Sequence, residues 1–183
     1  DVILIVCQPD KPRGRGLDVT VPPVKELGCS RAIPVHQPTK LRDGTLEAAM
    51  SEAKLDLAIV CAYGRIIPEA VFLAPVAVSW NVHTSLLPRH RGASPIQHAI
   101  LAGDEETGVS VMEVTAGLDE GPVLLERRIE LEATESGASL EAKLAVLGGE
   151  AIVAAIEAAK NVGIERVPQD DARATHAPKL EKG

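Results

Sequence analysis

Apolar segments of the chain predict a sheet with helices between its strands. Residues 2–6 and 57–62 are apolar without polar alternation, a pattern typical of strands buried on both faces, as in a parallel sheet. Residues 109–114 alternate apolar and polar side chains and predict a further strand. Residues 123–129 include Arg127 and Arg128, which favours a position at a sheet edge. A fifth apolar run, 76–82, ends in polar residues.

Capping residues place the helices. Pro22 and Pro23 favour a helix that extends to about residue 30, and Ser94 followed by Pro95 is a good cap and first residue for a helix to 101. Further helices are predicted over 44–53, after Pro68, and from 136 or 139 to about 161, where the glycines at 148 and 149 can kink or divide the helix. With a short strand at 33–35, this order predicts an α/β fold, a Rossmann-like, mostly parallel sheet with flanking helices.

Composition limits the class of protein. The 183 residues are 45% hydrophobic and 25% charged, enough for one domain with a sizeable core. Aromatic residues make up only 2%, so Val, Ile, Leu and Ala must build that core. No apolar run approaches the roughly 20 residues that cross a bilayer. The three cysteines are odd in number and far apart, which indicates reduced thiols in a cytoplasmic protein rather than disulfides or a zinc site.

The net charge of −7 and the pI near 5.3 argue against general nucleic-acid binding. Any RNA contact must come from a local basic patch. Two are visible, one in the Pro- and Gly-containing segment 8–16 and one at 89–91. Each is also compatible with ordinary solvated charge, and the arginines at 89 and 91 could equally contact a substrate phosphate or carboxylate.

The candidate chemistry lies at the end of the 76–82 run. Asn81 and His83 are two residues apart, which puts both side chains on one face of a strand. Open α/β sheets place ligands at the carboxyl ends of their strands. A neutral donor beside a titratable imidazole suits a reaction that passes through an oxyanion. The alternative is structural, with Asn81 capping the strand end and His83 a satisfied buried histidine.

Two other segments have both a structural and a chemical interpretation. Asp119 lies in the Gly-rich segment Ala116–Pro122, where an Asp can simply make a turn through its own backbone. Tyr63, the only tyrosine, follows the 57–62 strand in what can be a plain strand-to-helix turn. Residue spacing alone leaves these alternatives open.

The segment from Asn81 to Gly92, Asn-x-His-x-Ser-Leu-Leu-Pro-x-x-x-Gly, resembles the signature of the folate-dependent formyltransferases. This resemblance implies that Asn81, His83 and Asp119, the last in a Gly-Leu-Asp-x-Gly loop, form the catalytic group. It also implies that segments of the chain line the folate site, namely Tyr63, Gly64, Ile66, Ile67, Pro68, Ser85, Leu86, Leu87, Pro88, Gly117 and Leu118. Glu120 stands where the family usually has Thr.

The string Gln-Pro-Asp-x-Pro-x-Gly-Arg-Gly at 8–16 resembles methionyl-tRNA formyltransferases in particular. There the loop contacts the acceptor end of the initiator tRNA, which implies tRNA binding by Lys11, Arg13, Gly14, Arg15 and Gly16. Leu17 and Asp18 stand where that family often has lysines, so this loop is less basic. Against the family pattern, we expect residues 1–166 to be a catalytic domain that lacks its first strand and helix, and 167–183 to be an exposed linker towards a further domain.

The resemblance implies transfer of a formyl group from 10-formyltetrahydrofolate to the α-amino group of methionyl-tRNA, by a monomer that needs neither metal nor membrane. Asn81 and protonated His83 would donate hydrogen bonds to the developing oxyanion, and Asp119 would orient His83 and help relay a proton. Two alternatives remain. One is a formyltransferase for a small amine, such as an amino sugar nucleotide or glycinamide ribonucleotide. The other is a non-catalytic fragment that binds folate or RNA.

Overall fold

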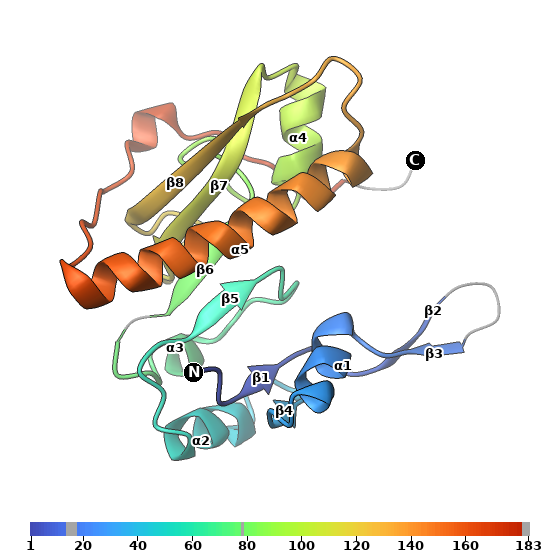
Figure 1. Ribbon diagram of the computed structural model, residues 1–183, viewed down its shortest axis with the longest axis vertical. Helices are drawn as coiled ribbons and strands as arrows, with labels where there is room; N and C mark the ends of the chain where they lie inside the picture. The colour runs from blue at the N-terminus through green and yellow to red at the C-terminus, as the bar shows by residue number, and fades with distance from the viewer. Residues whose placement is uncertain (14–17, 78, 181–183) are drawn as a thin grey trace. The chain divides into compact units, whose positions relative to one another are not determined.

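The computed structural model describes residues 1–13, 18–77 and 79–180 (Figure 1). The chain forms two compact units. Unit 1 comprises Asp1–Ala58 and Arg65–Val78, and unit 2 comprises Ile59–Gly64 and Ser79–Gly183. None of the helices among the described residues has the length and hydrophobicity of a transmembrane span.

Unit 1 pairs β1 (Ile5–Val6) in parallel with β4 (Val35–His36). The predicted helices are present as α1 (Pro23–Ser30) and α2 (Thr45–Glu52), followed by the short α3 (Glu69–Phe72), with Pro68 at its cap. A Cβ on Gly28 of α1 would come within 2.8 Å of Val35 and 2.9 Å of Ile5. Glycine therefore allows α1 to lie close against both strands. The apolar core of this unit is formed by Cys7, Leu41, Leu46, Met50, Val71 and Phe72.

Two predictions for unit 1 are wrong in part. Residues 8–16 were expected to form a loop, but Lys11–Arg13 form β2, which pairs antiparallel with β3 (Asp18–Thr20). The apolar run 2–6 was expected to be buried on both faces, but Val2 and Ile3 are exposed. Among the described residues β1 pairs only with β4, and an apolar run cannot reveal how many neighbours its strand will have.

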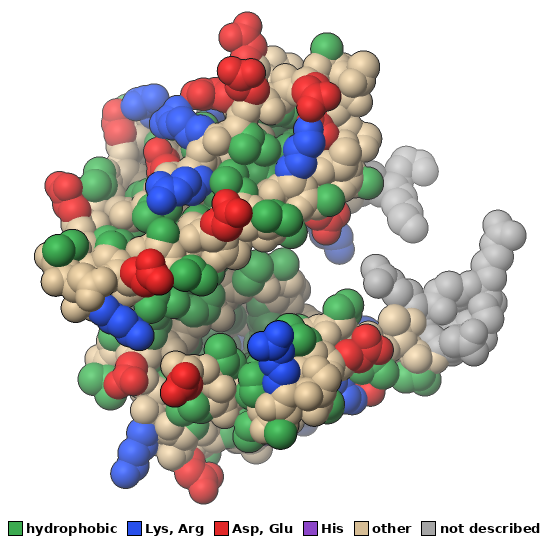
Figure 2. Space-filling model, viewed as in Figure 1, with side chains coloured by type: hydrophobic (Ala, Val, Ile, Leu, Met, Phe, Trp, Pro, Cys, Tyr) green, Lys and Arg blue, Asp and Glu red, His purple; other side chains and the backbone are tan. Residues whose placement is uncertain are grey.

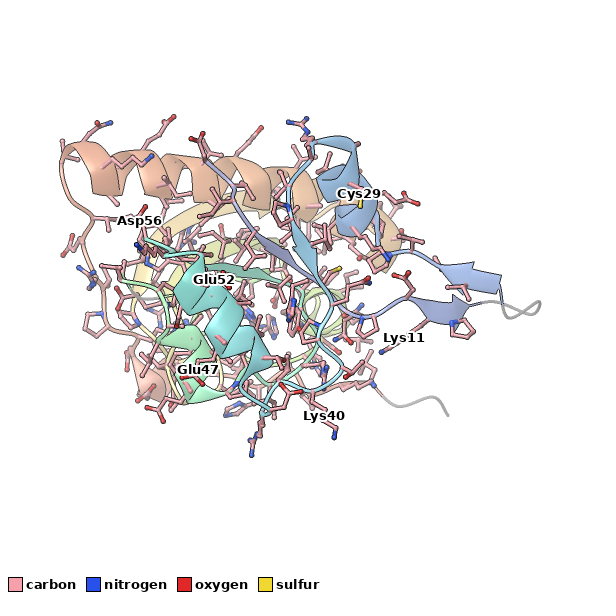
Figure 3. All side chains as sticks on the ribbon, turned by 90° about the horizontal axis from the view of Figure 1, so that it is seen from below. Lys11, Cys29, Lys40, Glu47, Glu52 and Asp56 are labelled. Atoms are coloured by element: carbon pink, nitrogen blue, oxygen red, sulfur yellow. The ribbon has the colours of Figure 1, made fainter. Side chains whose placement is uncertain are left out.

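The surface of unit 1 carries charged side chains together with exposed apolar ones such as Val24, Leu27 and Ile66. Glu47 and Glu52 project from α2, and Asp56 follows that helix (Figure 3). On the face seen in Figure 2, basic side chains are interspersed with acidic ones.

Unit 2 contains a four-stranded sheet in the order β5-β6-β7-β8, made of β5 (Ile59–Cys61), β6 (Trp80–His83), β7 (Glu106–Glu113) and β8 (Val123–Glu130). β5 and β6 are parallel, whereas β7 is antiparallel to both β6 and β8. β8 lies at the sheet edge, as its two arginines predicted. β5 was expected to be buried on both faces, but Ile59 and Cys61 are exposed. Like β1, it has one paired edge among the described residues.

Helix α5 (Gly137–Asn161) runs across this sheet (Figure 1). Its first turn is closed by a capping box between Ser136 and Ser139. The face towards the sheet carries Leu140, Leu144, Gly148, Ala151 and Ala155. A Cβ on Gly148 would meet Val82 of β6 at 3.0 Å, so this glycine permits close packing, and α5 continues through it without dividing.

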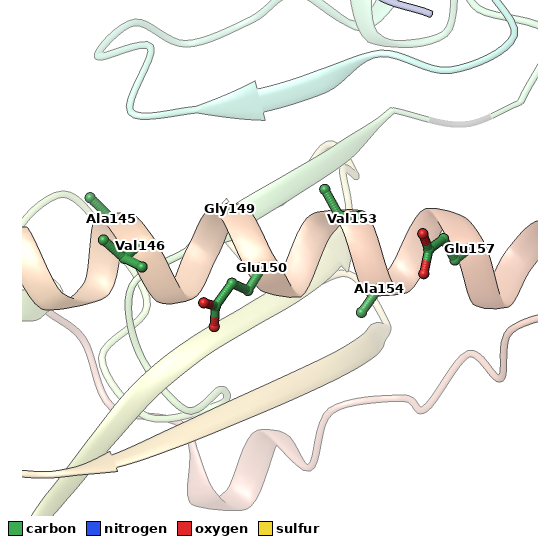
Figure 4. Close-up of a pocket in the computed structure, with 7 residues that line it drawn as sticks. All are labelled: Ala145, Val146, Gly149, Glu150, Val153, Ala154 and Glu157. Atoms are coloured by element: carbon green, nitrogen blue, oxygen red, sulfur yellow. The ribbon is translucent and has the colours of Figure 1, made fainter.

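Two further elements of unit 2 are a helix and a 3₁₀ turn. α4 (Pro95–Ala102) follows Ser94 as predicted and ends at Gly103 in a left-handed conformation, with φ of 66°. A short 3₁₀ helix, η1 (Asp171–Arg173), lies in the C-terminal segment. The outer face of α5 has a shallow groove, lined among others by Val146, Glu150, Val153 and Glu157 (Figure 4).

Candidate active site

The structure brings Asn81, His83 and Asp119 together at the carboxyl end of β6. Alternation along β6 puts Asn81 and His83 on the same face, and Asp119 comes from the turn between β7 and β8. Asn81 Nδ2 donates to Asp119 Oδ1 at 3.4 Å, and His83 Nδ1 lies 3.7 Å from Asp119 Oδ2. The side chains of His83 and Asp119 are 6% and 16% exposed. Both groups are therefore shielded from water but remain reachable.

The turn that follows β6 fixes two of these side chains through its backbone. The Nε2 of His83 donates to the carbonyl oxygen of His90 at 2.9 Å. The backbone N–H of Gly92 donates to Asp119 Oδ2, also at 2.9 Å. Gly92 has φ of 124°, and a Cβ there would lie 2.7 Å from the carbonyl oxygen of Ala177. Only glycine fits this turn without strain.

The contact with His90 determines which nitrogen of His83 is free for chemistry. A carbonyl oxygen can only accept, so Nε2 of His83 must carry a hydrogen. Nδ1 is then the ring atom that faces Asp119 and the atom at which a proton can be taken up or released. The Nδ1–Oδ2 separation of 3.7 Å is longer than a hydrogen bond.

A second set of charges holds the turn in place. Arg89 donates from Nε to Asp104 Oδ2 at 2.9 Å and also pairs through Nη2, while His90 Nε2 lies 2.7 Å from the same Oδ2. The Arg89 guanidinium is the main reason that the pKa of Asp104 lies below its ordinary value, and His90 adds to the effect. Arg89 is thus paired within the protein rather than simply solvated.

Arg91 is buried, so the interpretation of residues 89–91 as solvated surface charge is wrong for this residue. Its side chain is 5% exposed and donates from Nε to Gln169 Oε1 at 2.9 Å and from Nη2 to Asp171 Oδ1 at 2.7 Å. Its backbone N–H donates to Thr175 O, and its carbonyl accepts from Ala177 N–H. The C-terminal segment therefore lies against the turn.

Two supporting residues were missed by the sequence analysis. Gln169 donates from Nε2 to the carbonyl oxygens of Asp119 and Gly121. Ser110 is fully buried on β7, where its hydroxyl donates to Ser85 O and accepts from Leu87 N–H. The alternation over residues 109–114 puts Ser110 on the polar face of its strand, so no sequence signal indicated that this residue would be buried. Gln169 gave no local signal, because its contacts lie about 50 residues away.

The residues predicted to line a folate site are distributed over both units. Tyr63 and Gly64 follow β5, residues 85–88 follow β6, and residues 117 and 118 precede Asp119, all within unit 2; residues 66–68 belong to unit 1. Ser85 is fully buried and donates to Arg89 O at 2.6 Å. Its hydroxyl therefore supports the turn. Ile66 and Leu118 are exposed.

Glu120, the departure from the family pattern, lies over Gly117. A Cβ built on Gly117 would overlap the Glu120 carboxylate, which requires glycine at 117 as long as Glu120 keeps this position. Of the residues predicted to contact tRNA, Lys11 and Arg13 lie on β2, whereas Gly14, Arg15 and Gly16 lie outside the described residues. No cluster of three or more metal-binding side chains occurs in the part of the chain that the structure describes.

Comparison with known proteins identifies the family. The family model described as formyl transferase matches residues 1–156. The chain is 49% identical over 182 residues to a methionyl-tRNA formyltransferase of Myxococcus xanthus and 46% identical over 181 residues to one of Chromohalobacter salexigens. These alignments cover 100% and 99% of the chain but 58% and 56% of the relatives. The chain thus spans less than two thirds of their length.

Solved structures share the fold at low identity. Phosphoribosylglycinamide formyltransferase from Bacillus halodurans matches with a TM-score of 0.74 and 21% identity, over 88% of this chain and 82% of that one. The formyltransferase PseJ from Anoxybacillus kamchatkensis, in complex with a formamido sugar nucleotide and tetrahydrofolate, matches with a TM-score of 0.67 and 18% identity, over 96% and 85%. These likenesses confirm the predicted Rossmann-like α/β fold, and the family model, which covers most of the 183 residues, shows that the chain belongs to the formyl transferase family.

Proposed function

We propose that this chain carries the catalytic centre of an enzyme that transfers a formyl group from 10-formyltetrahydrofolate to the α-amino group of initiator methionyl-tRNA. The observation that carries the proposal is the convergence of Asn81, His83 and Asp119 at the end of β6. The names of the relatives at 46–49% identity support the choice of methionyl-tRNA as acceptor. In this proposal the enzyme acts in the cytoplasm as a monomer during translation initiation.

The chemistry begins with attack of the neutral amine on the formyl carbon. A new C–N bond forms, and negative charge develops on the formyl oxygen. Asn81 Nδ2 has two hydrogens, one directed to Asp119 and one available for this oxyanion. One such donor typically contributes about 2.7–4 kcal/mol to lowering the barrier.

Proton transfer completes the reaction. The tetrahedral intermediate collapses when the bond between the formyl carbon and the folate nitrogen breaks. The attacking amine must lose a proton, and the departing folate nitrogen must gain one. His83 Nδ1 and the Asp119 carboxylate are the groups placed to relay it, since Nε2 of His83 already donates to His90. Such acid–base assistance is commonly worth about 10²- to 10⁴-fold in rate.

Substrate recognition is assigned to the segments that the resemblance implies. We propose that the turns after β5 and β6 and residues 117–118, which all belong to unit 2, line the folate site. Residues 11–16 would contact the acceptor end of the tRNA, where the glycines allow close approach and Arg15 can pair with a phosphate. The catalytic domain would include the C-terminal segment as well as residues 1–166, because Gln169 and Asp171 pair with buried Arg91.

The test is single-turnover formylation of methionyl-tRNA by the complete protein, with 10-formyltetrahydrofolate as donor and His83→Ala as the control. Product from the parent but not from the variant supports the reaction, the acceptor and one catalytic residue. Competition with an amino sugar nucleotide and glycinamide ribonucleotide tests the acceptor, and preference for either would overturn the tRNA assignment. Arg15→Ala should weaken tRNA use without affecting folate affinity, and unchanged tRNA affinity would remove Arg15 from the interface.

A further inference from the structure

We infer that Gln169 is a positioning residue for Asp119, and that buried Arg91 fixes the orientation of its amide. This inference rests on the proposed function, because it assigns Gln169 a role in the same site. It makes the C-terminal segment, which the sequence suggested was an exposed linker, a contributor to the catalytic geometry.

The amide of Gln169 bridges the turn that carries Asp119. Its Nε2 donates to the carbonyl oxygen of Asp119 at 2.9 Å and to that of Gly121 at 2.7 Å. Both hydrogens of one amide are thus used on the two sides of residue 120. Asp119 has φ of 53°, in the left-handed region that residues with a side chain adopt uncommonly, Asp more readily than most. The two hydrogen bonds from Gln169 support this conformation of the turn.

The orientation of the Gln169 amide is unambiguous. Arg91 Nε can only donate, so the Gln169 atom that it contacts at 2.9 Å must be Oε1. The two carbonyls of the turn can only accept, so the atom facing them must be Nε2. Arg91 is itself held by Asp171 and by backbone hydrogen bonds to the C-terminal segment. The two N–H groups of the Gln169 amide are therefore held facing the turn by Arg91.

The same turn places the Asp119 carboxylate. Its Oδ2 accepts from Gly92 N–H at 2.9 Å and faces His83 Nδ1 at 3.7 Å. Misplacement of a reacting group by about 1 Å can cost a factor of about 10² in rate. Loss of the Gln169 bridge should therefore lower the rate of formyl transfer, although Gln169 itself need not touch either substrate.

Gln169→Glu tests the bridge with almost no change in size. A carboxylate can still pair with Arg91, but it presents acceptors to two carbonyl oxygens. We expect single-turnover transfer to fall about 10²-fold, with little change in folate affinity. Gln97→Glu, at an exposed position on α4, is the matched control and should retain parental activity.

A double-mutant cycle with Asp119→Asn separates positioning from general destabilisation. If Gln169 acts through Asp119, Gln169→Glu should add little to the loss already caused by Asp119→Asn. The inference would be overturned if the rate loss of the double variant equalled the product of the two single losses, or if Gln169→Glu kept the parental rate.

Hydrogen exchange tests the Gln169 bridge separately from the proposed enzymatic activity. Backbone amides of residues 117–121 should exchange faster in Gln169→Glu than in the parent or in Gln97→Glu. This readout needs no activity. An inactive parent would overturn the proposed function alone, whereas unchanged exchange in this turn would overturn the bridge.

Discussion

The side chain of Asp119 lies against Asn81, His83 and the backbone of Gly92, so its replacement by Asn tests all three contacts. The side chain keeps its size but loses its charge and exchanges one acceptor oxygen for a donor NH₂ group. Oδ2 accepts from Gly92 N–H at 2.9 Å, and Oδ1 accepts from Asn81 Nδ2 at 3.4 Å. An amide cannot accept both, so one contact must become donor against donor.

The structure predicts which contact changes. The shorter bond to Gly92 favours keeping the remaining oxygen there, which turns the new NH₂ towards Asn81. Asn81 must then rotate its own amide and move Nδ2 away from its present direction. Loss of the charge-assisted character of the Gly92 bond should cost about 1 kcal/mol of unfolding free energy, or a fall in Tm of about 2–4 °C for a protein of this size.

The effect on catalysis should be much larger than the effect on stability. A displaced oxyanion donor raises the barrier by about 2.7–4 kcal/mol, and each 1.36 kcal/mol is about tenfold in rate. We therefore expect formyl transfer to slow by about 10²- to 10³-fold, and further if the proton relay through His83 is also lost. Single-turnover kinetics, with donor and enzyme in excess over methionyl-tRNA, measure this step directly.

Asp56→Asn is the matched control, because Asp56 is exposed in unit 1. It removes the same charge and should leave both rate and Tm at parental values. A parental rate in Asp119→Asn would refute the role given to this carboxylate. A comparable loss in Asp56→Asn would mean that net charge, rather than site geometry, controls the rate.

Three further changes test the support of the site. Gly92→Ala should destabilise the protein by at least about 1–3 kcal/mol, since a non-glycine residue is strained at this φ and its Cβ would meet Ala177 O at 2.7 Å; parental urea denaturation would contradict this. Ser110→Ala leaves two buried backbone groups without their partner and should cost about 1–3 kcal/mol, whereas an unchanged midpoint of chemical denaturation would show that the turn relaxes around the loss. Asp104→Asn should lower stability at neutral pH but not in strong acid. The pKa of the Asp104 carboxyl is lowered beside Arg89, so the ionised carboxylate stabilises the fold above its unfolded pKa of about 4. This contribution is lost as the pH falls through the pKa of Asp104 in the folded protein. A stability difference that is independent of pH would rule out the ion pair as its source.

The starts of the helices and the identity of the central residues could be predicted from sequence alone. Signals at helix starts act within one turn of the chain, so Pro23, Ser94 and Ser136 could be recognised from their neighbours, and α1, α4 and α5 begin where these residues predict. Only Ser136 of the three caps its helix through a side-chain hydrogen bond. The spacing of Asn81 and His83 indicated a shared face because a strand alternates with a period of two. The resemblance added Asp119, and the structure places it beside both.

The faces of the strands that are covered, and the contacts that hold the site together, depend on the folded arrangement of distant segments. The exposure of Ile3 and Ile59 depends on strand neighbours, which an apolar run does not specify. The pair between Arg91 and Gln169 joins residues 78 positions apart, so no periodicity or local motif could predict it. Such contacts form only when the folded backbone brings distant segments together, and here they decide the orientation of Asp119 that the sequence left open.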